Sequence, residues 1–301
     1  MLFWAHGGQD RHWHTRRMSE TEKSDLHREF YAFTRNLLTR YQGTGKTFLI
    51  GNWEGDWMAG GTGIGQKLDI PAERLAAYTE WLDIRTRAID EAKASTPHAG
   101  VQVFSYLEIN GTRAAREKGL RRLVNEVLPR TRVDFVSISS YDFQGYHSWP
   151  APRTAESLRA QAFANLDYVE SMLPPRPVAG KRVFIGEIGY TWEEIVTKEK
   201  ISLEAAKREQ VRLALNQARV NIEWGMPLWL WWATFSSHDG TFGLVDNHTG
   251  APSLLHDTLQ EYFRWSRDFV ETQTRKNGTA PTAAEFRAAA LGQLDLQLSR
   301  L

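Results

Sequence analysis

The feature that most constrains the fold is an alternation of short apolar runs with longer amphipathic stretches. The apolar runs, rich in β-branched and aromatic residues, are 47–50, 101–107, 133–138, 183–188 and 228–235, and 2–5 could add a sixth. Near-continuous apolar strands that alternate with helices are typical of a parallel sheet covered by helices. The sequence therefore predicts an α/β fold.

The stretches between the runs carry helix start and stop signals. Ser19 and Glu22 have the spacing of a capping box, and Gly43 follows that helix as a stop. Pro71 opens the next helix. Further helices are predicted from near Thr112, from near Thr154, over 202–224 and over 253–269, and a second capping box at Thr282 and Glu285 predicts a helix after a polar segment.

Two closures suit this alternation, a (β/α)8 barrel and an open doubly wound sheet. An open sheet usually has a glycine-rich phosphate turn after its first strand. Segment 43–47 precedes a strand, and segment 60–65 has the wrong glycine spacing and opens no helix directly. We therefore predict a TIM-type (β/α)8 barrel over residues 1–270, followed by a helical tail over 271–301. The barrel is incomplete at its N-terminus, because a full one has about eight strands.

The composition excludes several classes of protein. Lys plus Arg number 37 against 36 for Asp plus Glu. The chain therefore lacks the basic excess that would predict nucleic-acid binding. The chain has no cysteine, which excludes thiol nucleophiles and Cys-ligated metals. No apolar stretch approaches the roughly 18 residues needed to span a membrane. The first residues are too short and too aromatic for a signal peptide, so no location is predicted, and a truncated N-terminus would leave secretion open.

Two glutamates stand directly after apolar runs. Glu54 follows the run that ends in Gly51-Asn52-Trp53, and Glu187 lies in Gly186-Glu187-Ile188-Gly189. Carboxylates are strongly hydrated, so two of them at the ends of buried strands indicate a site that uses acid, base or nucleophile chemistry. Cleavage of a glycosidic bond needs such a pair.

Tryptophan is unusually frequent, with twelve residues in the chain. Half of them follow predicted strands: Trp53, Trp57, Trp149, Trp192, Trp231 and Trp232. Sugar rings stack their apolar C–H faces on indole, so this placement favours carbohydrate binding. Packing of the same residues in the core is the alternative.

Together, these residues resemble the glycoside hydrolases of the large (β/α)8 superfamily called clan A. In that clan the acid/base glutamate follows an asparagine at the end of the fourth strand, and the nucleophile ends the seventh. Asn52-Trp53-Glu54 is similar to the former, with one residue inserted, and Gly186-Glu187 is similar to the latter. The resemblance implies a retaining hydrolase with Glu187 as nucleophile and Glu54 as acid/base.

The remaining candidates for the site are assigned by position along the chain. Asn52 could hold a sugar 2-hydroxyl, Tyr141 could hydrogen-bond the nucleophile, and Trp232, then Trp231, could lie under the sugar. The other predicted substrate-binding residues are Trp53, Trp57, Glu108, Asn110, Asp142 and His147. For each of these a structural role is an equal alternative. The expected partner is a carbohydrate, with no cofactor or metal, and no oligomeric state is predicted.

Two other functions compete with this hypothesis. The spacing His12-Trp13-His14 after residues 2–5 would suit a divalent metal on a first strand, as in metal-dependent barrel hydrolases. Such a site needs further histidines and an aspartate at later strand ends, but the fifth strand ends in Glu108-Ile109-Asn110 and the eighth offers no aspartate before Asp239. We therefore expect His6, His12 and His14 in a surface or mouth loop. The third possibility is a non-catalytic carbohydrate binder or an inactive barrel enzyme, which the missing barrel units favour.

Overall fold

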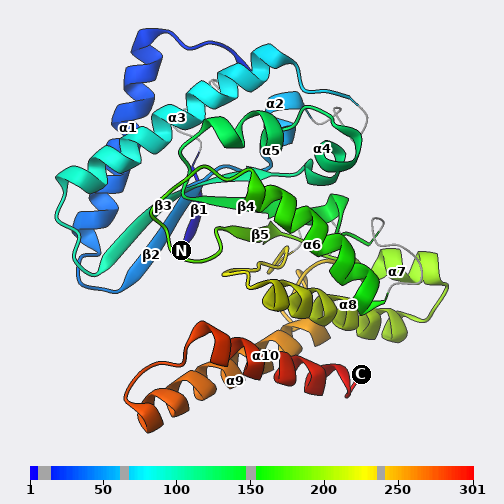
Figure 1. The fold of residues 1–301 in the computed structure, drawn as a ribbon. Coiled ribbons are helices and arrows are strands. Elements are labelled where there is room, and N and C mark those ends of the chain that lie inside the picture. Colours follow the sequence, from blue (N-terminus) through cyan, green and yellow to red (C-terminus); the bar gives the residue numbers. More distant parts are fainter. Residues whose placement is uncertain (6–14, 62–67, 147–153, 236–240) are drawn as a thin grey trace. The chain divides into compact units, whose positions relative to one another are not determined.

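Five parallel strands form one sheet in this computed structural model (Figure 1), which describes residues 1–5, 15–61, 68–146, 154–235 and 241–301. They lie side by side in chain order: β1 (Leu2–Trp4), β2 (Lys46–Gly51), β3 (Val101–Ile109), β4 (Phe135–Ser139) and β5 (Val183–Glu187). In the register, Leu2 lies opposite Leu49, Phe48 opposite Val103, and Leu107 opposite Val136. The fold is a mixed α/β structure, which confirms the α/β prediction, and its parallel sheet curls into a half-barrel.

Tyr106 shows how strongly the sheet curls. Its hydroxyl, on β3, donates a hydrogen bond of 3.3 Å to the Phe3 carbonyl on β1, which is not a neighbour of β3 in the sheet. The ring also meets Phe184 of β5 edge to face, with centroids 5.7 Å apart. A Cβ on Gly51 would overlap the ring of Tyr106, so only glycine fits beside it. One aromatic side chain on the concave face therefore packs against both edge strands.

The helices largely begin and end as the sequence predicts. Ser19 caps α1 (Glu20–Arg40) in a complete capping box with Glu22, and α3 (Ala72–Ser95) follows Pro71. Short helices come next: α2 (Gly55–Gly60), α4 (Thr112–Lys118), α5 (Leu123–Glu126), η2 (Leu128–Arg130) and η3 (Ser140–Asp142). The later helices are α6 (Ala155–Ser171), α7 (Trp192–Glu199), α8 (Leu203–Trp224), α9 (Leu254–Asn277) and α10 (Ala283–Leu298).

The chain divides into two compact units. Unit 1 comprises Met1–Asp142 and Ala164–Gly186, and unit 2 comprises Phe143–Phe163 and Glu187–Leu301. The predicted domain boundary at residue 270 falls inside α9, which continues without a break to Asn277. In the described part of the chain, no helix is both long and apolar enough to cross a bilayer.

In unit 1, α1 and α3 lie side by side over the sheet (Figure 1). Arg85 of α3 is 2% exposed, and its guanidinium lies 4.4 Å from the Phe30 ring and 4.0 Å from the Trp81 ring. Its Nη2 donates to the carbonyls of Ala5 and Gly51, at distances of 2.7 and 2.8 Å. Burial lowers the pKa of Arg85 to about 10. The guanidinium thus ties the carboxyl ends of β1 and β2 to the helix layer.

A buried ion pair network joins α3 to the amino end of β4. Arg176 Nη1 and Nη2 donate to the two carboxylate oxygens of Asp90, at 2.9 and 2.6 Å, and Nε donates to Asp134 at 2.8 Å. The other oxygen of Asp134 accepts from the backbone amide of Ser105 on β3 at 2.9 Å. Arg176 therefore neutralises a carboxylate that is only 1% exposed.

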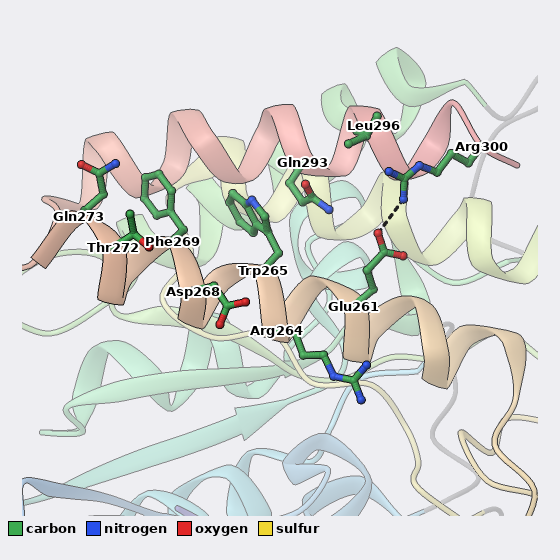
Figure 2. A pocket seen from close by; sticks show the side chains of 10 residues that line it. All are labelled: Glu261, Arg264, Trp265, Asp268, Phe269, Thr272, Gln273, Gln293, Leu296 and Arg300. Carbon is green, nitrogen blue, oxygen red and sulfur yellow. Dashed lines mark hydrogen bonds and ion pairs between the residues drawn. The ribbon is translucent and has the colours of Figure 1, made fainter. Parts of the chain in front are cut away.

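In unit 2, α9 and α10 pack antiparallel. Arg300 at the end of α10 pairs with Glu261 near the start of α9 at 2.7 Å, while Phe269 and Phe286 meet at the other end. A surface groove of about 570 Å³ follows the two helices, and Figure 2 shows Trp265 and Phe269 pointing from α9 toward α10. None of the residues that line this groove is among the predicted site residues.

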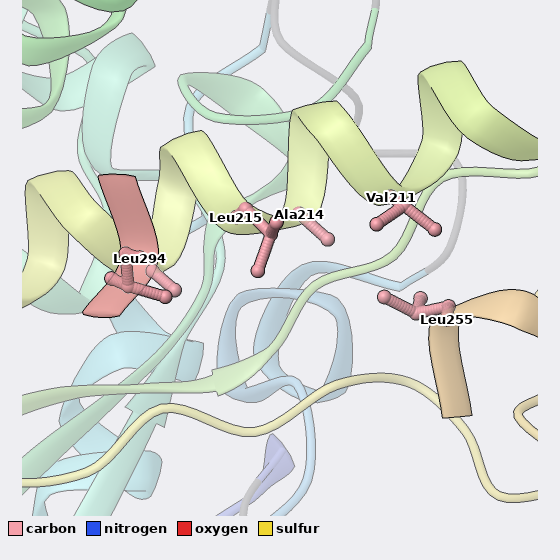
Figure 3. Close-up of a cluster of buried hydrophobic side chains, with 6 residues drawn as sticks. Val211, Ala214, Leu215, Leu255 and Leu294 are labelled. Atoms are coloured by element: carbon pink, nitrogen blue, oxygen red, sulfur yellow. The ribbon is translucent and has the colours of Figure 1, made fainter. Parts of the chain in front are cut away.

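The inner side of the same helices packs on α8. Figure 3 shows Val211, Ala214 and Leu215 of α8 facing Leu255 of α9 and Leu294 of α10, and all five are buried. Trp229, Trp231, Leu244, Leu259, Tyr262 and other half-buried apolar residues surround this cluster. The tail is thus part of the core of unit 2.

Two predicted elements are wrong. Segment 228–235 does not form a strand of the sheet; its residues Trp229 and Trp231 pack on the α8 cluster, and Ala233 and Thr234 accept hydrogen bonds from Leu244 and Val245. The helix predicted from Thr112 is broken, because Gly119 ends α4 in the left-handed conformation at φ 65°. The first prediction failed because the apolar run packs on α8, and the second because a glycine interrupts the helix.

We expect Arg176→Leu to destabilise the protein by about 3 kcal/mol, because it leaves the buried Asp134 carboxylate without its cation. Urea unfolding measures this loss. Arg130→Leu is the control, since it breaks an exposed pair with Glu126 and should cost less than about 1 kcal/mol. Equal losses for the two variants would contradict the prediction.

Candidate functional site

Glu54 follows β2 and is the N-cap residue of α2. Its backbone is left-handed, at φ 34° and ψ 64°, and its side chain makes no capping hydrogen bond to the helix amides. The preferred N-cap residues Ser, Thr, Asp and Asn have an extended backbone and a side-chain oxygen that accepts from those amides. A non-glycine residue in this region costs on the order of 1–3 kcal/mol. Glu54 is 4% exposed, and its carboxyl does not cap α2.

Asn52 holds the end of β2 against the end of β3. Its Nδ2 donates to the Glu108 carbonyl and its Oδ1 accepts from the Glu108 amide, both at 3.1 Å. The side chain thus pairs with a backbone as a strand would. Asn52 has no exposed surface. Its amide supports Glu108, and no exposed atom of Asn52 is available for the predicted contact with a sugar hydroxyl.

Glu108 is a third buried carboxylate, at the end of β3. Oε1 accepts from the Glu54 backbone amide at 3.1 Å and from Ser139 Oγ at 2.9 Å. Oε2 accepts from Ser137 Oγ at 3.1 Å. A buried charge needs such donors to offset the loss of hydration. This carboxylate cross-links the turn after β2 to β4.

The turn after β2 is fastened a second time through Asp56. Its backbone amide donates to Asn110 Oδ1 at 3.0 Å, while its carboxylate accepts from the amides of Asn110 and Leu123, each at 2.9 Å. Burial raises the pKa of Asp56, and these amide donors oppose the rise. Asn110 is 8% exposed and serves as the partner of Asp56 in this pair.

Asp142 and Tyr141 lie in η3 after β4, and both are half-buried. The backbone amide of Arg113, in the first turn of α4, donates to Asp142 Oδ2 at 2.6 Å. Oδ1 has no hydrogen-bond partner among the described residues. Burial raises the pKa of Asp142 to about 7, although the Arg113 amide opposes this. Asp142 is thus a carboxyl that titrates near neutral pH.

Glu187 is the last residue of β5 and is 6% exposed. Gly186 before it lies directly against β4, because a Cβ there would overlap Ser137 Oγ. The position therefore requires glycine, and this close approach fixes β5 just before the candidate nucleophile.

Within unit 2, the residues after Glu187 are held by backbone and amide contacts. The Ile188 carbonyl accepts from the Trp232 amide at 2.8 Å, and a Cβ on Gly189 would lie 2.6 Å from the Trp232 carbonyl. The Tyr190 hydroxyl donates to the Gln144 carbonyl at 2.8 Å. Gln210 donates to the Tyr190 carbonyl. This segment is thereby attached to α8.

The candidate tryptophans differ in environment. Trp53 and Trp57 flank Glu54 along the chain and are 37% and 41% exposed, so their rings are accessible in unit 1. Trp231 is half-buried and donates its indole N–H to the Phe242 carbonyl at 2.9 Å. Its ring centroid lies 5.7 Å from that of Tyr190. Trp232 is half-buried as well. Trp231 is therefore largely a core residue, while Trp53 and Trp57 have the exposure a sugar platform needs.

Direct contacts thus connect Asn52, Glu54 and Glu108 among the predicted residues, and connect Asn110 to Asp56. Sequence reasoning missed Asp56, Ser137 and Ser139. The two serines stand two apart on an apolar strand and so share a face, which was the available signal for an inward polar pair. His147 lies outside the described residues.

A metal site has no support in the described part of the chain, where no group of three or more His, Asp or Glu residues could hold an ion. The predicted loop histidines His6, His12 and His14, and Asp239, lie outside the described residues.

The titration of Asp142 predicts a pH-dependent stability. The pKa of Asp142 is higher in the folded protein than in the unfolded chain. Its stabilising contribution to the free energy of unfolding is therefore complete below about pH 4 and is lost as the pH rises to about 7. Asp142→Asn keeps an acceptor for the Arg113 amide and cannot ionise. At pH 7.5 it should exceed the wild type in unfolding free energy by on the order of 2 kcal/mol, allowing for solvent screening, and by little at pH 4.

Urea unfolding at both pH values measures the difference, with the exposed Asp268→Asn as control. An Asp142→Asn protein less stable than the wild type at pH 7.5 would contradict the prediction.

Comparisons of this chain with protein-family models, with curated proteins and with solved structures find no match. The function is therefore argued from the residues.

Proposed function

We propose that this protein is a retaining glycoside hydrolase built on an incomplete TIM-type barrel, with Glu187 as nucleophile and Glu54 as acid/base. The observation that supports this most is the setting of Glu54. It is a nearly buried glutamate after a strand, in a left-handed conformation, with a carboxyl that does not cap the helix it begins. Such strained residues cluster at functional sites. Glu187, equally buried, ends β5 of the same sheet.

The proposed reaction proceeds in two displacements. Glu187 attacks the anomeric carbon as the bond to the leaving oxygen breaks, and Glu54 gives that oxygen its proton. Glu54 then removes a proton from water, which attacks the anomeric carbon and releases Glu187 from the glycosyl ester. This mechanism needs the two carboxyl groups about 5–5.5 Å apart. Two carboxyls this close resist joint ionisation, which keeps the acid protonated.

The proposed substrate is a neutral carbohydrate. Trp53 and Trp57 are accessible indole rings on either side of Glu54 in the chain, and indole stacks well on the apolar face of a sugar. The formal net charge of the whole chain is +1, which gives no reason to expect a strongly charged polymer.

We expect Glu187→Gln and Glu54→Gln each to lower kcat by about 100-fold or more, because each removes an acid, base or nucleophile function. A panel of nitrophenyl glycosides measures turnover, and proton NMR of the first sugar released should show the anomer of the substrate. The matched control is Glu193→Gln in the first turn of α7, an exposed glutamate that should leave kcat unchanged.

Unchanged turnover in Glu187→Gln would refute the nucleophile assignment, and release of the opposite anomer would refute the retaining mechanism. A wild-type protein that binds polysaccharide in affinity electrophoresis but turns over no glycoside would instead be a carbohydrate binder.

A further inference from the structure

We propose that Glu108 is the positioning residue of Glu54: it holds the acid/base glutamate through its backbone amide and does not itself contact substrate. The inference rests on the proposed function, since it concerns the group that delivers the proton. It assigns Glu108 a role different from the substrate contact that its place at a strand end predicts.

The hydrogen bonds of Glu108 leave no surface for a ligand. Its two oxygens accept from the Glu54 amide, Ser139 Oγ and Ser137 Oγ, at distances of 3.1, 2.9 and 3.1 Å. The residue has no exposed area. A fully buried carboxylate that receives these donors presents no face to a substrate. Its contribution to a reaction must therefore pass through one of those donors.

The donor that matters is the amide of Glu54. The backbone of this residue is left-handed at φ 34°, a conformation that residues other than glycine rarely adopt. The bond from the Glu54 amide to Glu108 fixes the peptide plane before Glu54, and the bond from the Asp56 amide to Asn110 fixes the chain two residues later. Glu108 thereby anchors the backbone from which the proposed acid projects.

The same network reaches the strand that carries Glu187. Ser137, which donates to Glu108, fills the space where a side chain on Gly186 would stand, and a Cβ there would also lie 3.4 Å from Glu108 Oε2. Glu108 therefore helps to set how closely β5 approaches β4 just before the proposed nucleophile. Both contacts lie within unit 1.

Two variants separate positioning from direct catalysis. Glu108→Ala removes the acceptor of the Glu54 amide, so that amide should exchange its hydrogen at least about tenfold faster than in the wild type. Glu108→Gln keeps an oxygen for the Glu54 amide and can donate to Ser137 Oγ from its nitrogen. It should restore slow exchange at Glu54 and recover most of the activity lost in the alanine variant.

The matched control is Asp134→Ala at the opposite end of the same strands. Asp134 is also a buried carboxylate that accepts from a backbone amide and a serine hydroxyl, both of Ser105. The control should destabilise the protein without changing exchange at Glu54 beyond the change in global stability.

The kinetic readout is the dependence on the leaving group. A misplaced acid slows phenyl glycosides, which need protonation, more than dinitrophenyl glycosides, which do not. Glu108→Ala should lower kcat/KM by about 100-fold for the phenyl substrate and by less than about tenfold for the dinitrophenyl one. Asp134→Ala should change both rates by the same factor.

The outcomes are distinct. Unchanged exchange at Glu54 in Glu108→Ala, or equal loss on both substrates, overturns the positioning role. A loss of more than about 1000-fold in Glu108→Gln overturns it in favour of a catalytic carboxylate. If the wild type hydrolyses no glycoside, the proposed function fails, and the role of Glu108 as positioner of an acid fails with it. Slow exchange restored by the Glu108→Gln substitution would then show only a structural support of Glu54.

Discussion

The structure of unit 1 depends on how its buried carboxylates are satisfied. Asp134 at the amino end of β4 and Glu108 at the carboxyl end of β3 are both essentially inaccessible to water. Each accepts from one backbone amide; Glu108 also accepts from two serine hydroxyls, and Asp134 from one serine hydroxyl and from Arg176. Burying a charge without such donors would cost several kcal/mol. Each carboxylate therefore restrains the positions of the groups that donate to it. The two carboxylates thus connect neighbouring parallel strands at both ends, outside the regular backbone ladder.

The two ends differ in what this connection achieves. At the amino end Asp134 is neutralised by Arg176, which also binds Asp90, so the result is an ion pair network between α3 and the sheet. At the carboxyl end Glu108 accepts from an amide and two hydroxyls, and the amide belongs to a strained glutamate. Such neutral donors stabilise a negative charge without cancelling it. Backbone strain beside a buried charge is a cost that a purely structural strand end would have no reason to carry, which is why we locate the proposed chemistry at this end.

Features that depend only on residues close together in the sequence could be predicted. The capping boxes that begin at Ser19 and at Thr282 are local, and the structure confirms both of them and the helices that they start. Segment 228–235 failed because its tryptophans pack on α8, a contact that its own sequence does not encode. The candidate site shows the same limit. Burial of Glu54 followed from strand position, but the amide of Asn52 pairs with Glu108, 56 residues away, and this pairing is visible only in three dimensions.

Side chains hold the two edge strands of the curled sheet. In a closed barrel each strand is held by two neighbours, whereas here β1 and β5 are the edges of the sheet. β1 has only three residues, which limits its exposed edge, and Tyr106 and Arg85 both bond to carbonyls on β1 or directly after it. Beside β5, Gly186 packs on Ser137, and Ser137 donates to Glu108. Side chains from the concave face and from α3 thus hold the two edge strands, and the backbone of Glu54 is tied to β3 through its hydrogen bond to Glu108.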